Sequence, residues 1–506
     1  MAEPGRPSRR FLGLLLLIVL VGLGIRVAYV WTVTRHDEAL GDQYYYSALA
    51  NTLAEGRGFA EPDIEDRAVP SADHPPLTSI VAAPASWIVG TDGDAATRHR
   101  RLTAQRLVMA GVGAATVAAI GFAARRYGTD PRAAERIGLL AASLAAVHPG
   151  LWINDGLIMS ESVGALTIAL LTWAALACLS QPTAWRMGAL GMAAGLAGLA
   201  RAEALLLVPL LVVPVAFTRR GDPDRRPLYP RTRWLSAAAA GTLLVLGPWV
   251  VPNLFRFNQL VTMSTNDGLT LLGTNCDRAY QGESRGLWLL QCIDSVDTDG
   301  DGVDDWAEYS AGTPALGEDQ DESDQSAAYR SEAIDYARHH LHDLPAVAAH
   351  RVGRVWGVVD VRQQTDFYNV NEGRHRNVSR AAAIAFPILA ITAVAGMFVL
   401  RRRRLPVWPV GVHFASTTIV AALFYGLIRF RVGAEVAVVV GAAVALDALW
   451  ARVRGRSPGA ADAEDDQPAS PDGGNDTATP NASGDAPGGD DDGSAGDRVD
   501  AGTLAP

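Results

Sequence analysis

The chain has 506 residues, of which 49% are hydrophobic, and a formal net charge of -10. The negative charge is concentrated near the end, where residues 457–506 hold twelve acidic residues and a single arginine. The rest is close to neutral, so the charge gives no reason to expect a nucleic-acid partner. The apolar residues come in blocks of about 20, the length that crosses a bilayer, and this excludes an ordinary soluble enzyme.

Ten apolar segments predict an all-α polytopic membrane protein with about ten transmembrane helices. The first segment, 11–31, follows a short N-terminal stretch, 1–10, and its length favours an uncleaved helix over a signal peptide. Arg26, near the end of this segment, is expected to extend towards the membrane interface. The other segments are 103–123, 137–153, 163–180, 187–200, 203–218, 233–254, 381–400, 406–427 and 432–451.

Clusters of arginine set the predicted orientation in a bacterial plasma membrane. Arginine is enriched in cytoplasmic loops, and the clusters here place both termini in the cytoplasm. Two large loops, 32–102 and 255–380, then lie outside, and each precedes a block of membrane helices, 103–254 and 381–451. Residues 77–92 are apolar enough for another span, but that crossing would move five arginine clusters outside. We therefore expect an interfacial helix there.

The last segment, 452–506, is predicted to be a disordered cytoplasmic tail. It is rich in Gly, Ala, Pro, Ser and Asp and has almost no large apolar residues. Such a segment cannot bury enough apolar surface to offset the entropy lost on ordering.

The first outer loop carries the residues that most suggest chemistry. Asp42 is followed by three tyrosines ending at Tyr46, and His74 precedes two prolines and a leucine. An acidic side chain at a membrane surface can act as a general base towards a substrate anchored in lipid. Two alternatives stay open: Asp42 also suits a helix N-cap, and the tyrosines also suit an interfacial aromatic belt.

Further charged residues lie at the predicted outer ends of spans. Charges at membrane depth are costly and usually face a partner or a polar cavity, and arginine binds phosphate through two parallel hydrogen bonds. The alternatives are a structural ion pair, a helix cap or ordinary interfacial charges. The residues concerned are Glu161, Arg201, Glu203, Arg429 and Arg431.

Taken together, these motifs resemble the membrane glycosyltransferases of the C superfamily, in particular the bacterial family-39/83 type. That type is related to protein mannosyltransferases and to the aminoarabinose transferases of lipid A. The resemblance covers most of residues 11–451. The matching positions are Asp42, Tyr46 and Ala50, then Gly56, Gly58 and Phe59, His74 to Leu77, Ser160 and Glu161, Gly198 to Arg201, and Arg429 to Arg431.

The resemblance implies transfer of a sugar from a polyprenyl-phosphate donor to a lipid, glycan or protein acceptor on the outer face, with inversion. Asp42 is then the base and Glu161 a second catalytic acid, and substrate contacts fall to Tyr46, His74, Arg201, Glu203, Arg429 and Arg431. Family members commonly carry Asp-Glu where this chain has Asp42 and Gln43, so a metal held by adjacent acids is not carried over.

A transporter or flippase of lipid-linked sugars is the alternative function. Transporters tend to show internal repeats and helices broken at the bilayer midplane. We see no internal repeat in this sequence, and the candidate acids lie at the outer boundary.

The sequence of the second outer loop predicts three structural features. Cys276 and Cys292 are expected to form a disulfide outside the cell, with two free thiols as the alternative. Residues 326–354 show helical periodicity and are expected to cover the membrane part as a lid. A calcium-loop pattern predicts a structural Ca²⁺, with a solvated acidic loop as the alternative. Its ligands would be Asp297, Asp299, Asp301 and Glu308, with Gly302 at the turn.

Overall fold

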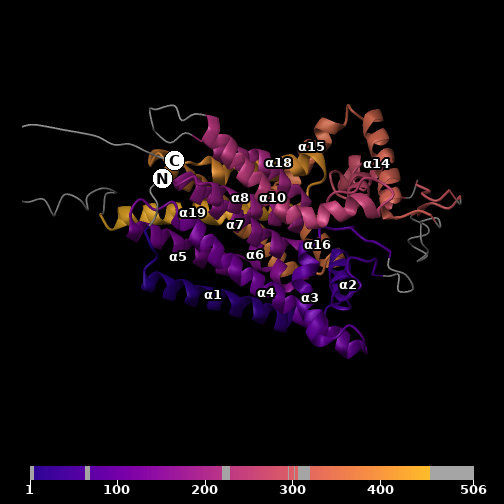
Figure 1. Ribbon diagram of the computed structural model, residues 1–506, viewed down its shortest axis with the longest axis horizontal. Coiled ribbons are helices and arrows are strands. Elements are labelled where there is room, and N and C mark those ends of the chain that lie inside the picture. Colours follow the sequence, from indigo (N-terminus) through magenta and orange to yellow (C-terminus); the bar gives the residue numbers. More distant parts are fainter. Residues whose placement is uncertain are drawn as a thin grey trace, which may run out of the picture. The chain divides into compact units, whose positions relative to one another are not determined.

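The chain is built from helices, as its apolar blocks predict. The computed structural model describes residues 5–62, 69–218, 228–293, 296–300, 302–305 and 319–455 (Figure 1). Within these ranges the only β-type pairing is an isolated bridge between Ala60 and Pro70. Six helical stretches are long and apolar enough to cross a membrane: Arg9–Thr34, Ala95–Arg125, Ser160–Ser180, Arg231–Arg256, Arg376–Arg402 and Ile428–Val453.

These stretches correspond to six labelled helices, some with a short extension. They are α1 (Arg9–Tyr29, continued by a π-helical turn to Thr34), α4 (Ala95–Arg125), α7 (Ser160–Ser180), α10 (Leu228–Arg256), α17 (Arg376–Arg402) and α19 (Val432–Val453). A seventh crossing arises if α5 (Pro131–Val147) and the stretch Pro149–Gly156, which includes α6 (Pro149–Trp152), form one span bent by 56°.

Shorter apolar helices complete the membrane part. They are α8 (Ala184–Ala200), the stretch Ala202–Phe217 that ends in α9 (Val213–Phe217), and α18 (Trp408–Leu423). The segment expected to be interfacial forms α3 (Leu77–Val89), whose 13 residues reach about 20 Å and fall short of a bilayer of about 30 Å. The all-helical membrane class is confirmed, and the number of ten crossings stays a prediction.

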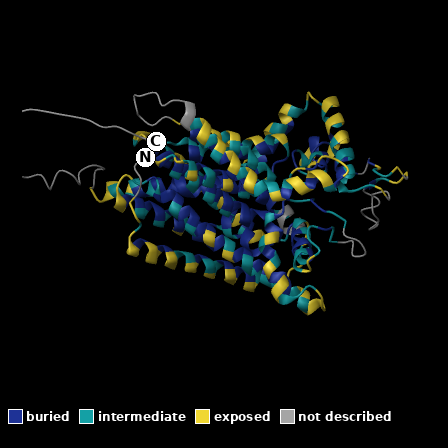
Figure 2. Cartoon of the chain, viewed as in Figure 1, coloured by how far each residue is buried: buried dark blue, intermediate teal, exposed yellow. Residues whose placement is uncertain are grey.

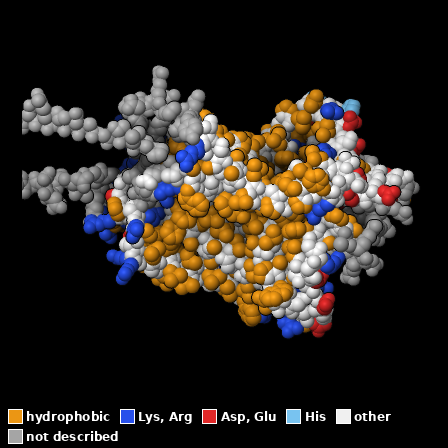
Figure 3. All heavy atoms as spheres, viewed as in Figure 1, with side chains coloured by type: hydrophobic (Ala, Val, Ile, Leu, Met, Phe, Trp, Pro, Cys, Tyr) orange, Lys and Arg blue, Asp and Glu red, His pale blue; other side chains and the backbone are white. Residues whose placement is uncertain are grey.

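One end of these helices gathers arginines. The start of α1 meets α5, because the Ser8 amide donates to Glu135 at 2.8 Å. At the same end Asp447 of α19 pairs with Arg136 of α5 at 2.9 Å and with Arg403, just after α17, at 3.6 Å. Figure 3 shows arginines at both ends of a broad apolar surface, with most of the acidic side chains at only one of the two ends. Members of two of the predicted clusters, Arg136 and Arg403, therefore share one carboxylate, and the side of the membrane on which they lie stays a prediction.

Burial differs strongly between the helices (Figure 2). Most residues of α19 are buried, whereas α1, α10 and α17 expose large apolar side chains such as Leu16, Leu244 and Ile391. Exposed apolar faces of this kind suit contact with lipid tails. The expectation for Arg26 is wrong: its side chain is 1% exposed and pairs with Asp155 at 2.6 Å inside the bundle.

Most of the remaining helices belong to the two loops that were predicted to lie outside. The first loop contributes α2 (Asp42–Ala54) and α3. The second contributes α11 (Asp267–Leu272), α12 (Asp277–Tyr280), α14 (Glu322–His339), α15 (Leu344–Val355) and α16 (Val361–Asn371). The helical segment predicted at 326–354 is thus two helices, with a break at 340–343.

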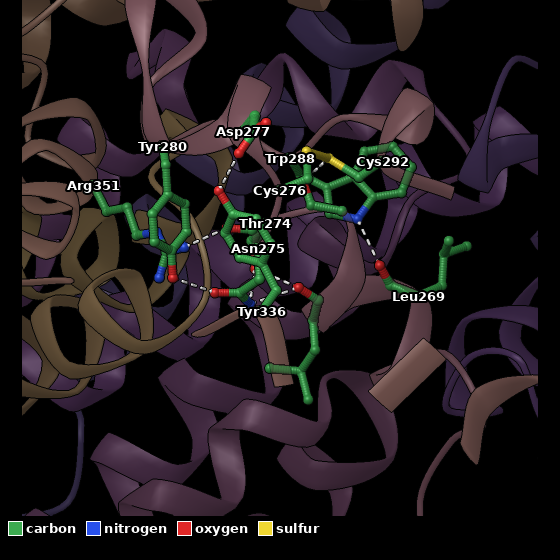
Figure 4. The surroundings of a disulfide bond; sticks show 12 residues. Leu269, Thr274, Asn275, Cys276, Asp277, Tyr280, Trp288, Cys292, Tyr336 and Arg351 are labelled. Atoms are coloured by element: carbon green, nitrogen blue, oxygen red, sulfur yellow. Dashed lines mark hydrogen bonds between the residues drawn. A yellow bond between two sulfur atoms is a disulfide. The ribbon is translucent and has the colours of Figure 1, made fainter. Parts of the chain in front are cut away.

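The predicted disulfide is present between Cys276 and Cys292 (Figure 4). Polar contacts tie its surroundings to the two later helices. Tyr336 of α14 donates to Asp277 at 2.7 Å, and Arg351 of α15 donates to the Thr274 carbonyl at 2.6 Å. The disulfide is therefore part of a small folded unit rather than an isolated link in a loop.

The predicted calcium loop is only partly described. Asp301 and Glu308 lie outside the described residues, as does the tail from Arg456 onward. Asp297 accepts hydrogen bonds from the amides of Gly300 and Gly302, at 2.7 and 2.9 Å. Among the residues that the structure describes, no group of three or more His, Cys, Asp or Glu side chains is placed to hold a metal. Calcium binding stays a prediction.

Candidate active site

Asp42 lies at the first position of α2, at the end of the bundle opposite the arginine cluster. Gly41 precedes the helix with φ 55°, a conformation that favours glycine, and no side chain caps this end. The Asp42 carboxylate instead accepts a hydrogen bond from Arg429 at 2.9 Å. The capping alternative is therefore not realised, and Asp42 is turned towards the residues before α19.

His74 is the second neighbour of Asp42. Its Nε2 lies 3.6 Å from Asp42 and 3.5 Å from Asp73, and its ring stacks on Tyr46 at 5.1 Å between centroids. Burial lowers the pKa of His74, but the carboxylates of Asp73 and Asp42 outweigh it and raise the pKa to about 8. The imidazole is thus mostly a cation at neutral pH, clamped between two acids and an aromatic ring.

The Asp42 carboxylate is ionised and partly open to solvent. Burial raises the pKa of Asp42, but the charges and hydrogen bonds of Arg429 and His74 outweigh it and hold the pKa well below its usual range. The side chain keeps 31% exposure, against 12% for Glu372 and none for Glu161, the two other acids that contact Arg429. Of these three carboxylates, Asp42 is the one most open to an incoming substrate.

Glu161, at the start of α7, lies among arginines. Its Oε1 is 3.3 Å from Arg201, 3.4 Å from Arg374 and 3.7 Å from Arg429. Because its side chain has no exposed surface, Glu161 acts here as a shared counter-ion for the three guanidinium groups.

Arg201 follows the end of α8 and is fixed by two further contacts. It donates to Ser160 at 2.8 Å and to Glu203 at 2.6 Å. The ion pair that was the structural alternative for Arg201 and Glu203 is therefore present, and it belongs to the same cluster as Asp42 and Glu161.

Two members of the cluster, Glu372 and Arg374, were not singled out from the sequence. Glu372 pairs with both Arg374 and Arg429, and Arg374 also donates to Asn154 at 3.1 Å. Burial raises the pKa of the Glu372 carboxyl, although the two arginines oppose that shift. The sequence pattern that could have identified these two residues is an acid and an arginine two positions apart, a few residues before the predicted span 381–400.

A pocket opens beside this cluster. Three arginines line it, Arg374, Arg429 and Arg431, together with apolar side chains such as Ile153 and Val432. Arg431 does not join the Asp42 cluster; it pairs with Glu435, one turn further along α19, at 2.6 Å. Cationic groups at an otherwise partly apolar pocket suit a ligand that combines an anion with an apolar chain.

The predicted site residues thus fall into two groups. Seven of them meet at one place: Asp42, Tyr46, His74, Glu161, Arg201, Glu203 and Arg429. Arg431 lines the adjoining pocket.

No protein-family profile and no curated protein sequence matches the chain. Among solved structures it is similar to the oligosaccharyltransferase of Archaeoglobus fulgidus. The match has 14% identity and a TM-score of 0.46 for the complex with zinc and sulfate, and 13% and 0.48 for the enzyme tethered to an acceptor peptide with an NVT sequon. Both cover 88% of this chain and 50% of the archaeal one, so the chain spans half the length of that enzyme.

A further similar structure is ArnT from Cupriavidus metallidurans bound to undecaprenyl phosphate. It shows 15% identity and a TM-score of 0.35, and the match covers 88% of this chain and 80% of that protein. The motifs resemble a superfamily of glycosyltransferases, and an oligosaccharyltransferase and ArnT are among the structural neighbours.

Proposed function

We propose that the protein is a membrane-embedded glycosyltransferase that moves a sugar from a polyprenyl-phosphate donor to an acceptor hydroxyl. The observation that carries this proposal is the Asp42 carboxylate: it is ionised, partly exposed and held by Arg429 at the rim of an arginine-lined pocket. A base and a phosphate site side by side are what such a transfer needs.

The reaction uses Asp42 as a general base. The acceptor oxygen attacks the anomeric carbon of the sugar while its proton passes to the Asp42 carboxylate. The bond between that carbon and the phosphate oxygen breaks, and its electron pair leaves with the polyprenyl phosphate. Attack from the side opposite the leaving group inverts the anomeric centre.

The leaving phosphate needs stabilisation of charge more than it needs a proton. Arg374, Arg429 and Arg431 line the pocket, and the planar guanidinium group binds phosphate through paired hydrogen bonds. Arg201 lies behind Arg374 and Arg429, is linked to both through Glu161, and helps to fix their positions. His74 adds a second cation beside Asp42.

The acceptor is proposed to approach from the extracytoplasmic side. The helix α1 runs from the arginine-rich end to the loop that carries Asp42, and α19 runs back from Arg429 towards Asp447 and the arginine-rich end. With that arginine-rich end in the cytoplasm, as the positive-inside rule predicts, the site faces outward.

The decisive experiment compares wild type with Asp42→Asn. General bases contribute about 10²–10⁴-fold to a rate, so we expect release of polyprenyl phosphate from labelled lipid-linked sugars to fall by roughly 100-fold or more. Binding of undecaprenyl phosphate should persist. The matched control is Glu38→Gln, an exposed acid of the same loop that is 51% exposed. Equal turnover in wild type and Asp42→Asn would remove Asp42 from the base role.

A further inference from the structure

Arg431 differs from the other two arginines of the pocket in how it is held. Its side chain is 2% exposed, and its guanidinium carbon lies 3.8 Å from the ring centroid of Phe386, which covers one face. Its Nη2 atom is buried, and it has no hydrogen-bond partner within the described residues. A buried cationic donor in a pocket wall, without a partner, points to an anionic ligand.

Glu435 fixes the other side of this guanidinium. One carboxylate oxygen accepts from Arg431 Nε at 2.6 Å, and the second lies 2.5 Å from His148 Nε2. The Arg431, Glu435 and His148 side chains are all at most 4% exposed. Since both oxygens of Glu435 are engaged, the carboxylate cannot turn without losing one partner.

The backbone leaves space for this arrangement. His148 stands between α5 and α6, where the chain bends, and Gly150 lines the pocket. A β-carbon at position 150 would lie 2.8 Å from His148 Nε2 and 3.0 Å from the Glu435 side chain. Because glycine has no β-carbon, the His148 imidazole and the Glu435 carboxylate can both lie against the backbone at position 150.

We propose that Glu435 and His148 are positioning residues for the donor phosphate. They hold the Arg431 guanidinium so that its unpartnered Nη2 meets that phosphate in the pocket. This inference rests on the proposed function and deepens it, because it assigns the orientation of Arg431 to Glu435, which also lines the pocket, and to His148 behind it.

The test measures binding of undecaprenyl phosphate to the purified full-length protein in detergent. Variants are Arg431→Ala, Glu435→Ala and the double variant. Loss of a charged hydrogen bond changes affinity by about tenfold or more, so each single variant should bind about tenfold more weakly. If Glu435 acts through Arg431, the double variant binds no more weakly than Arg431→Ala alone. Multiplied effects in the double variant would overturn the proposal.

Conservative variants separate positioning from general damage. Glu435→Gln keeps an oxygen that accepts from Arg431, so its affinity should lie between those of wild type and Glu435→Ala. His148→Ala removes one of the two partners of Glu435 and should also weaken binding. This variant replaces Glu435→Ala in the test if Glu435→Ala does not fold. Unchanged affinity in both Glu435→Gln and His148→Ala would overturn the proposal.

A matched control lies on the same helix. Asp447 of α19 is a buried carboxylate that pairs with Arg136 and Arg403, away from the pocket. Asp447→Asn should leave the affinity for undecaprenyl phosphate unchanged, and an equal loss there would show a general effect of α19 and overturn the positioning role.

Arg429→Ala distinguishes this inference from the proposed function. If Arg429→Ala weakens binding while Glu435→Ala does not, the positioning role fails and the proposed function stands. If wild type does not bind undecaprenyl phosphate, the donor class itself fails.

Discussion

Gln43 shows how one side chain distinguishes this site from the acid pair that it resembles. Its amide nitrogen donates to the Glu372 carbonyl at 3.0 Å, and its oxygen accepts from the Ile158 amide at 3.3 Å. A carboxylate has no proton to donate to a carbonyl, and here it would add a buried negative charge near Asp42 and Glu372. The glutamine thus joins three segments of the site in a way that glutamate cannot.

His74 makes the stability of the site depend on pH. Its pKa rises from 6.5 to about 8 on folding, so the stabilisation is fully present below pH 6.5 and is lost as the pH rises through about 8. A shift of that size corresponds to about 2 kcal/mol. We expect His74→Gln to lower the melting temperature clearly at pH 6 and little at pH 9, measured by thermal unfolding in detergent.

The control for this prediction is His339→Gln. His339 lies on the surface of α14 with 72% exposure, so its removal should leave the melting temperature nearly unchanged at both pH values. A constant difference between wild type and His74→Gln across the pH range would contradict the prediction.

Among the elements, α14 has a direct connection to the active-site loop. Glu322 in its first turn accepts hydrogen bonds from the Ala72 amide and from the Ser71 hydroxyl, the latter at 3.2 Å, and these residues lie two and three positions before His74. Asp73 and Arg256 face the same carboxyl. The Glu322 side chain therefore links α14 to the loop that carries His74.

The ionisation of Glu322 should loosen this connection at high pH. Burial first, and then Asp73, raise the pKa of Glu322 from 4.5 to about 8. An acid with a higher pKa in the folded state binds its proton more tightly when folded, so stability falls as the pH rises from 4.5 through about 8. We expect Glu322→Gln to remove that part of the pH dependence, seen as slower hydrogen exchange around residue 72 than in wild type at pH 9.

The same comparison at pH 6 serves as its internal control, because Glu322 is then largely protonated and resembles glutamine. If amide hydrogens near residue 72 exchanged faster in Glu322→Gln than in wild type at both pH values, the ionised carboxylate of Glu322, rather than its protonated form, would stabilise the contact with the loop.

Across the whole molecule, the ion pair of Arg26 and Asp155 joins α1 to the 3-10 turn Asn154–Gly156 that follows α6. Both side chains are at most 3% exposed, and Asp155 follows Asn154, which contacts Arg374 of the site. Removing one partner leaves a buried charge unpaired, which costs about 3–5 kcal/mol. We expect Asp155→Asn to lower stability by that amount in an unfolding titration.

A double replacement tests the cause of this loss. Arg26→Met with Asp155→Leu removes both charges, and buried pairs replaced by apolar residues of similar size are often no less stable. The double variant should therefore be more stable than Asp155→Asn. The opposite order would show that the pair itself, and not the unpaired charge, sets the stability.

The sequence predicts those residues of the site that stand in a recognisable local pattern. Asp42, His74 and Arg429 stand out because charge next to an apolar span is costly and so draws attention. Glu372 and Arg374 offer only a weaker mark, an acid and an arginine two positions apart near the end of a long polar loop, and their importance comes from partners on distant segments. Arg26 was misinterpreted for the same reason, since its position near a helix end says nothing about Asp155.

The fold shows the same division between local and distant information. Hydropathy over about 20 residues identifies apolar helices, because each satisfies its backbone hydrogen bonds internally. The bend at His148, by contrast, depends on packing between elements, and no single window of sequence contains it.

The contact between Asp42 and Arg429 joins residues 387 positions apart, and this has a consequence for biosynthesis. The N-terminal part of a chain emerges from the ribosome first, so α1 and α2 are synthesised long before the residues that precede α19. A nascent chain inserted as far as α18 (Trp408–Leu423) already carries Asp42 but still lacks Arg429 and Arg431. The transferase that we propose therefore becomes competent only once Arg429 and the residues beside it are made, and shorter nascent chains cannot consume the lipid-linked donor.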